Sequence, residues 1–271
     1  MRHAKSNLIS KDPIWEAIRE EVTRDAAGEP LLASFLHSAV LKHDSLEKAL
    51  SFNLAAKLGS AILSEMLIRE VVDDALQYDP AIGQQIRGDL RAVRERDPAC
   101  DRFSTPLLYF KGFHALQSYR VAHWLWNQSR RELALFMQNR ISEVFAVDIH
   151  PAARIGTGIM IDHATGVVIG ETAVVGDNVS MLHEVTLGGT GKDTGDRHPK
   201  IGCGVLLGAG AKILGNVVIG RCSKVGAGSV VLHDVPPNST VAGVPAEIIA
   251  EEHPEQPALE MDHKFSCRGD C

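Results

Sequence analysis

Aliphatic residues recur at every sixth position from Ile155 to Val231, and most are followed by glycine or another small or polar residue. A six-residue period matches neither the 3.6 residues of a helical turn nor the two-residue alternation of a strand. Short periods of this kind are typical of solenoids, so the segment predicts a parallel β-helix. The periodic positions are Ile155, Ile161, Ile169, Val175, Met181, Leu187, Ile201, Leu207, Ile213, Ile219, Val225 and Val231.

Each six-residue repeat can supply one short strand and one turn, and three repeats can close a triangular coil. Stacked coils then bury a continuous column of aliphatic side chains, with each coil contacting only its neighbours. The alternative is a β-sandwich with glycine-rich turns. The unbroken phase over the thirty residues from Ile201 to Val231 argues against it.

The phase of the repeat slips twice. Ile161 and Ile169 are eight residues apart, two more than one repeat. Leu187 and Ile201 are fourteen residues apart, which we interpret as two repeats plus two residues. Because residues 188–200 are polar and glycine-rich, they predict a loop that leaves the solenoid, and loops on rigid scaffolds often carry function.

The first half of the chain has helical rather than six-residue periodicity. Helix starts are expected at Asp12-Pro13 and Asp79-Pro80, with proline in the first turn. A further helix carries Leu46, Leu50, Leu54 and Leu58 and ends at Gly59. The fold class is therefore α+β in two parts. We expect an α-helical domain over residues 1–145, a β-helix with a projecting loop over 146–250, and a flexible tail over 251–271.

Composition excludes several classes of function. The net charge of −6 argues against nucleic-acid binding through a general basic field. The chain has no apolar run long enough to span a membrane, and its polar N-terminus predicts no signal peptide. Five scattered cysteines suit a reduced, cytoplasmic protein. Cys267 and Cys271 alone make a weak metal site, so no metal is expected.

Candidate catalytic residues lie in the helical half (Asp97), just before the first repeat (Asp148) and in the two slips (Asp162, His163, Arg197 and His198). A neutral imidazole can take a proton from a hydroxyl, and a carboxylate behind it fixes the tautomer. An arginine can hold a substrate carboxylate with two parallel hydrogen bonds. Spacing alone only suggests such a site.

Longer motifs in both halves of the chain identify a family. The segments are Asp148-Ile149-His150-Pro151, Ile161-Asp162-His163-Ala164-Thr165-Gly166, Gly188-Gly189-Thr190-Gly191-Lys192 and Gly195-Asp196-Arg197-His198-Pro199-Lys200, together with Arg94-Glu95-Arg96-Asp97-Pro98 in the helical half. They resemble the bacterial serine O-acetyltransferases, a branch of the hexapeptide-repeat acyltransferases. The resemblance covers about Pro13 to Met261, and it implies that the β-helix is left-handed.

The resemblance implies a role for each candidate residue. His163 is the general base that takes the proton of the serine hydroxyl, and Asp148 is its carboxylate partner. Asp97 and Asp162 are expected to bind the serine ammonium group. Arg197 and His198 are expected to bind the serine carboxylate or to stabilise the oxyanion. The activated serine attacks acetyl-CoA directly, and L-cysteine is expected to inhibit by occupying the same pocket.

Coenzyme A contacts are also implied by the resemblance. CoA is expected to lie between adjacent solenoids, with its pantetheine arm close to Ala209 and Ala227 in two Gly-Ala-Gly runs. Lys224 is expected to meet its phosphates, and Gly189 and Thr190 are expected nearby. The alternative is that these glycines form ordinary turns.

Assembly and partners follow from the same resemblance. The family forms trimers that commonly pair into hexamers through the helical domains. Its C-terminus commonly inserts into O-acetylserine sulfhydrylase and typically ends in isoleucine, whereas this chain ends in Cys271. Because cysteine buries less apolar surface than isoleucine, we expect weak or absent docking.

Three other functions are consistent with the repeat alone. Another hexapeptide acyltransferase could act on a sugar or antibiotic hydroxyl, but it leaves Asp97 and the Arg197-His198 loop unexplained. A zinc lyase on the same scaffold would need three converging histidines, and only His163 and His183 are expected to stack. The last alternative is a scaffold without catalysis.

Overall fold

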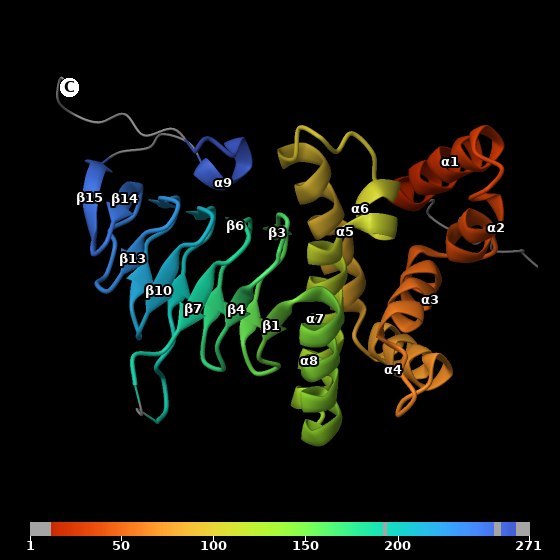
Figure 1. Cartoon of the computed structure of the whole chain (residues 1–271), viewed down its shortest axis with the longest axis horizontal. Coiled ribbons are helices and arrows are strands. Elements are labelled where there is room, and N and C mark those ends of the chain that lie inside the picture. The colour runs from red at the N-terminus through yellow and green to blue at the C-terminus, as the bar shows by residue number, and fades with distance from the viewer. Residues whose placement is uncertain (1–11, 192–193, 252–255, 264–271) are drawn as a thin grey trace, which may run out of the picture.

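The computed structural model describes residues 12–191, 194–251 and 256–263. Helices occupy the first half and stack against one end of a β-solenoid (Figure 1). In these described residues, no helix is long and apolar enough to cross a membrane. The helices are α1 (Pro13–Gly28), α2 (Ala33–Leu36), the π-helical turn η1 (His37–Leu41), α3 (Leu46–Leu58), α4 (Glu65–Tyr78), α5 (Pro80–Arg96), α6 (Ser104–Tyr109), α7 (Lys111–Asn127), α8 (Arg131–Phe145) and α9 (Pro257–Glu260).

The helix starts follow local capping chemistry. Asp12 accepts a hydrogen bond from the backbone N–H of Ile14, and Asp79 accepts one from Ala81, each just before a proline. Ser45 caps α3 in the same way through the N–H of Lys48. Side-chain caps satisfy backbone donors that have no partner within the helix. The helix starts expected at Asp12-Pro13 and Asp79-Pro80 are therefore confirmed.

The second half is a three-sided parallel solenoid. Sheet A has the order β1-β4-β7-β10-β13, sheet B has β2-β5-β8-β11, and sheet C has β3-β6-β9-β12-β14-β15. All these pairs are parallel except β14 with β15. The strands are β1 (Val147–Ile149), β2 (Arg154–Ile155), β3 (Met160–Ile161), β4 (Val167–Ile169), β5 (Val174–Val175), β6 (Ser180–Met181), β7 (Thr186–Gly188), β8 (Lys200–Ile201), β9 (Leu206–Leu207), β10 (Lys212–Leu214), β11 (Val218–Ile219), β12 (Lys224–Val225), β13 (Val230–Val231), β14 (Ser239–Gly243) and β15 (Ala246–Glu251).

The strand register explains both slips and corrects one interpretation. A regular coil takes 18 residues, as in the pairing of Lys200 with Val218. The first slip lengthens its coil to 20, as in the pairing of Arg154 with Val174. The second lengthens its coil to 26, since Val174 pairs with Lys200. Because β7 in sheet A leads directly to β8 in sheet B, the second slip is one repeat with an eight-residue insertion. The interpretation as two repeats plus two residues is wrong, although the projecting loop is present.

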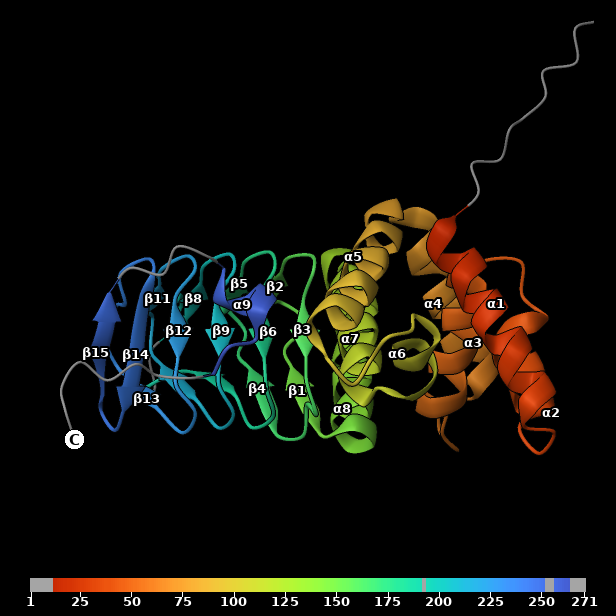
Figure 2. The ribbon, with the colours of Figure 1, turned by 90° about the horizontal axis from the view of Figure 1, so that it is seen from above.

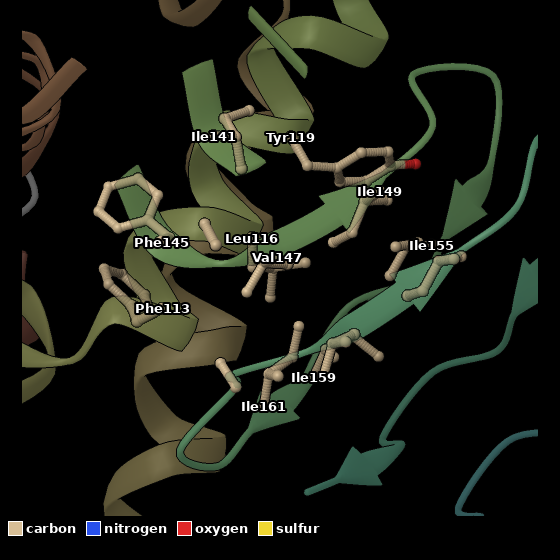
Figure 3. Close-up of a cluster of buried hydrophobic side chains, with 14 of the residues drawn as sticks. Phe113, Leu116, Tyr119, Ile141, Phe145, Val147, Ile149, Ile155, Ile159 and Ile161 are labelled. Carbon is tan, nitrogen blue, oxygen red and sulfur yellow. The ribbon is translucent and has the colours of Figure 1, made fainter. Parts of the chain in front are cut away.

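A single apolar core runs from the helices into the first coil. Figure 3 shows Phe113, Leu116 and Tyr119 of α7 against Val147 and Ile149 of β1. Further along the same core, Ile155, Ile159 and Ile161 begin the aliphatic column of the solenoid. All these side chains are buried. The helical domain therefore closes the open end of the β-helix, where unpaired strand edges and apolar side chains would otherwise meet water.

The C-terminal segment was expected to be flexible from residue 251, but part of it forms a short helix. Helix α9 lies over sheet C near β6 and β9 (Figure 2). Ala258 is fully buried, and its carbonyl accepts a hydrogen bond of 2.8 Å from Ser180 Oγ. Polar composition hid this helix, because only Pro257 and Ala258 of its four residues are buried. Cys267 and Cys271 lie outside the described residues.

Candidate active site

A cavity of about 390 Å³ lies where the helical domain meets the first coil. It is lined by Asp97 from the end of α5 and by Asp162 and His163 from the turn after β3. We call these three residues the His163 cluster. The remaining wall comes from α5 and its C-terminal turn (Val93, Ala99), the α6–α7 region (Tyr109, Phe110, Lys111, Gly112, Phe113) and β3 (Met160, Ile161). The structure thus brings together three of the predicted residues from both halves of the chain.

His163 lies on a tight turn with unusual backbone angles. His163 and Ala164 have φ of +56° and +60°, a left-handed conformation that costs free energy for residues with a Cβ. The turn is held in place from several sides. Ala164 is buried, the N–H of Gly166 donates to Ala146 O at 2.8 Å, and Lys111 Nζ donates to Thr165 Oγ1. The His163 side chain is 74% exposed, and its Nε2 lies 3.6 Å from Asp162 Oδ2.

Asp97 caps the C-terminal end of α5, and its Oδ1 accepts a hydrogen bond from Ala99 N at 2.9 Å. The preceding residue, Arg96, is buried and donates to Ser180 Oγ and Asn178 Oδ1 of the solenoid. Burial lowers the pKa of Arg96 to about 10, so its guanidinium remains charged at neutral pH. Arg96 therefore anchors the end of α5 against the second coil.

A second cluster forms at the corner between sheets A and B. Arg197 Nη2 lies 2.7 Å from Glu171 Oε2, and the hydrogen bond from Arg197 lowers the pKa of Glu171. His198 is buried, with Nδ1 2.9 Å from Thr172 Oγ1. Burial, and then the charge of Arg197, lowers the pKa of His198, so its imidazole is neutral near pH 7. Burial also lowers the pKa of His150. The charges of Glu171 and Asp148 oppose this shift, and the charge of Arg197 adds to it.

We call Asp148, His150, Glu171, Arg197 and His198 the Arg197 cluster. Asp148 lies in the middle of β1, and its Oδ1 accepts a hydrogen bond from Gln138 Nε2 at 2.7 Å. Among the described residues, no ion pair joins Asp148 to His163. The two clusters lie towards opposite ends of the sheet A strands, since β4 separates the His163 turn from Glu171. The three residues of β4 span about 10 Å.

Two residues of these clusters and their surroundings were not singled out from the sequence: Lys111 and Glu171. Lys111 lines the cavity beside His163, and Glu171 holds Arg197. Glu171 follows β4 in the segment Val168-Ile169-Gly170-Glu171-Thr172, which also resembles the family and was its only signal. Lys111 could not be placed from sequence, because its contact with Thr165 joins positions 54 residues apart.

The expected CoA residues also divide between two corners. Ala209 and Ala227 follow β9 and β12 at the corner between sheets C and A, in a column with His163 and His183. The N–H of Gly228 donates to Ala209 O at 2.7 Å, so these coils stack closely there. Gly189 and Thr190 follow β7 near the Arg197 cluster, and Gly189 lies close to Arg197. Lys224 is buried, and its Nζ donates to Asp262 O at 2.6 Å, so the C-terminal segment already contacts this residue.

The predicted stacking of two histidines is confirmed. The rings of His163 and His183 lie edge to face with centroids 5.9 Å apart. Zinc sites normally need at least three protein ligands. Across the described residues, no three His, Cys, Asp or Glu side chains converge in a way that could hold a metal ion.

Known proteins resemble both halves of this chain. Residues 14–118 match the family model described as serine acetyltransferase, N-terminal, and residues 198–233 match the bacterial transferase hexapeptide model. The serine acetyltransferase of Escherichia coli is 58% identical over 253 residues, 93% of each chain.

Solved structures agree with the sequence relatives. A serine acetyltransferase in complex with cysteine has a TM-score of 0.92 at 55% identity, covering 93% of this chain and 98% of its own. One from Brucella abortus in complex with coenzyme A has a TM-score of 0.89 at 54% identity, covering 92% and 99%. The expected combination of a helical domain with a parallel β-helix is therefore confirmed.

Proposed function

The chain belongs to the serine acetyltransferase family, and we propose that its two clusters together transfer the acetyl group of acetyl-CoA to the hydroxyl of L-serine. The products are O-acetyl-L-serine and CoA, and the reaction serves cysteine biosynthesis. The observation that carries the assignment of residues is the His163 cluster. There an exposed imidazole faces a cavity with two carboxylates, which suits an amino-acid substrate with a hydroxyl group.

His163 acts as the general base. Its neutral imidazole takes the proton of the serine hydroxyl, and the serine oxygen attacks the carbonyl carbon of the thioester. The bond between that carbon and the CoA sulfur then breaks, and the imidazolium returns the proton to the thiolate. No acyl-enzyme forms. Asp148 orients the imidazole and stabilises its protonated form, as a carboxylate partner does in other general-base pairs.

The remaining residues bind the amino acid. Asp97 and Asp162 bind the ammonium group of serine, because two carboxylates at one cavity favour a cation. Arg197 and His198 bind its carboxylate or stabilise the oxyanion of the tetrahedral intermediate. L-cysteine fits the same pocket with a thiol in place of the hydroxyl, so it inhibits by competition with serine.

The two clusters meet between copies of the chain. Within one chain they lie towards opposite ends of sheet A, so neither forms a complete site alone. In a trimer of parallel solenoids, the His163 cluster of one copy faces the Arg197 cluster of the next. CoA lies in the groove between them, beside Ala209 and Ala227 on one copy and Gly189 and Thr190 on the other. Two trimers pair through their helical domains to form a hexamer.

We also propose roles for Lys224 and for the cysteines. Lys224 binds CoA phosphates only after the contact with Asp262 is released. Cys100, Cys203 and Cys222 are free thiols, which suits a cytoplasmic enzyme.

The test is thiol release from acetyl-CoA in the presence of L-serine. Removal of a general base typically costs about 10²- to 10⁴-fold in rate, so we expect that loss in kcat for His163→Ala. His233→Ala, an exposed histidine of the solenoid, is the matched control and should turn over at the wild-type rate. Wild-type turnover by His163→Ala contradicts the assignment of the base. Faster transfer to a sugar or antibiotic hydroxyl than to L-serine contradicts the acceptor.

A further inference from the structure

A buried ion pair lies where helices α5 and α7 meet the first coil. The side chains of Asp89 and Arg120 are 0% and 3% exposed, and Arg120 Nη2 and Nε lie 2.7 and 3.1 Å from Asp89 Oδ2. The attraction between buried charges barely offsets the cost of removing them from water. Such a pair therefore contributes little net stability. Its presence is better explained by a role in fixing how α5 and α7 pack on the first coil.

Both members of the pair also bind the solenoid. Asp89 Oδ1 accepts a hydrogen bond from the backbone N–H of Ile159 at 2.9 Å. Arg120 Nη2 donates to the carbonyl of Gly156 at 2.8 Å. Gln117 of α7 completes the network by donating to Asp89 Oδ2 at 2.9 Å. Because these bonds are directional, they fix both the rotation and the sliding of α5 on residues 155–159.

The backbone of α5 touches the same coil. A Cβ on Gly88 would lie 2.5 Å from Thr157 Oγ1, so only glycine permits this approach without displacement. Asp97 follows Asp89 by eight residues, about 12 Å along the helix. A change in the seating of α5 at Asp89 therefore moves Asp97, which faces Asp162 and His163 of the solenoid across the cavity.

We propose that Asp89 and Arg120 are positioning residues for acetyl transfer, which hold α5 on the first coil so that Asp97 is correctly placed for the serine ammonium group. The pair itself touches no substrate. The proposal rests on the proposed function, because it requires Asp97 to bind serine.

The first test is Arg120→Lys. Lysine keeps the positive charge but lacks the planar fork that binds Asp89 and Gly156 together. A misplacement of about 1 Å can cost up to about 100-fold, so we expect the KM for L-serine to rise about tenfold. The KM for acetyl-CoA and kcat at saturating serine should change much less. The inhibition constant of L-cysteine should rise in parallel with the KM for serine.

The matched control is Arg87→Lys on the same helix. Arg87 binds Asp12 and Glu47, both within the helical domain, at 2.6 Å each. The same substitution there removes comparable ion pairs without touching the solenoid. It should leave the KM for serine unchanged, even where the thermal midpoint falls.

The second test moves α5 without replacing either Asp89 or Arg120. Gly88→Ala should raise the KM for serine, because its new Cβ collides with Thr157 Oγ1. Adding Thr157→Ala removes that oxygen and should restore the wild-type KM. A general loss of stability does not predict such a rescue. If Arg120→Lys fails to fold, the comparison of Gly88→Ala with the double variant therefore still tests whether the position of α5 sets the KM for serine.

Asp97→Asn distinguishes the binding role of Asp97 from the positioning role of Asp89 and Arg120. A wild-type KM for serine in Asp97→Asn overturns the binding role of Asp97, and the positioning role with it. A raised KM in Asp97→Asn, with wild-type values in folded Arg120→Lys and Gly88→Ala, overturns only the positioning role. Raised KM values in all three, with rescue by Thr157→Ala, support both.

Discussion

At the residue scale, histidines in this chain perform distinct tasks that burial separates. His163 is exposed on a strained turn, whereas His114 is buried beside Phe145 and donates from Nε2 to Leu107 O at 2.7 Å. Burial lowers the pKa of His114 to about 4. His114, His123 and His150 all make hydrogen bonds within the chain, which is typical of structural histidines. Sequence motifs distinguished His163 from these residues, whereas the burial of each side chain is known only from the structure.

His114 predicts acid sensitivity of the fold. Its pKa falls from 6.5 when unfolded to about 4 when folded, so the unfolded chain binds the additional proton. The stabilisation is present above pH 6.5 and is lost as the pH falls towards 4. We expect about 2 kcal/mol of the free energy of unfolding to be lost between pH 7 and pH 5 through this residue. Urea unfolding of His114→Gln should show a loss smaller by that amount.

Exposed His233 is the control for this prediction. His233→Ala should lose stability between pH 7 and pH 5 as the wild type does. Equal pH dependence in His114→Gln and the wild type would show that His114 is not buried in its neutral form.

At the element scale, each coil depends on close contact between successive turns. A Cβ on Gly202 would lie 2.7 Å from the backbone N of Arg221 in the next coil. The repeat therefore requires glycine here because of packing between coils, although Gly202 does not have a positive φ. Close packing between coils also explains why the eight-residue insertion leaves the solenoid at a corner, where it does not separate stacked strands.

Gly202→Ala should therefore destabilise the solenoid. Overpacking of this kind typically costs about 1 to 3 kcal/mol, because backbone atoms of the next coil cannot move aside. Gly28→Ala is the matched control, since a Cβ there meets no atom within 4 Å. Thermal unfolding should show a lower midpoint only for Gly202→Ala. Equal midpoints would mean that the coils can separate at little cost.

At the scale of the whole molecule, the helical domain serves both as a cap for the solenoid and as a source of site residues. It covers the end of the apolar column through α7 and α8, and it supplies Asp97 through α5. The Arg197 cluster lies away from that junction, which is why we propose that the complete site is formed with a second copy of the chain.

Mixing two inactive variants tests this arrangement. His163→Ala lacks the base, and Arg197→Ala lacks the arginine of the other cluster. If sites form between adjacent chains of a trimer, refolding the two together in equal amounts should make about a quarter of the sites intact. Thiol release should recover to about that fraction of the wild-type rate. Each variant refolded alone is the control, and no recovery on mixing would place both clusters in one chain.

The sequence by itself determined the repeat, the helical half, the projecting loop and the identity of the candidate residues. These are local properties: a six-residue period, capping residues, and motifs that specify residue types in order. It did not determine the length of the inserted loop, since fourteen residues fit either two repeats or one repeat with an insertion. Only the strand register decided between them.

The tertiary structure alone decided which candidates meet. Asp97 joins Asp162 and His163 because α5 packs on the first coil, whereas Asp148 lies on β1 and Arg197 lies at the corner between sheets A and B. It also showed the docking of α9 and the buried pair Asp89–Arg120. These contacts join residues far apart in the chain, and their free energy depends on geometry and exclusion of water. Neither the geometry of these contacts nor the exclusion of water from them can be inferred from the order of residue types along the chain.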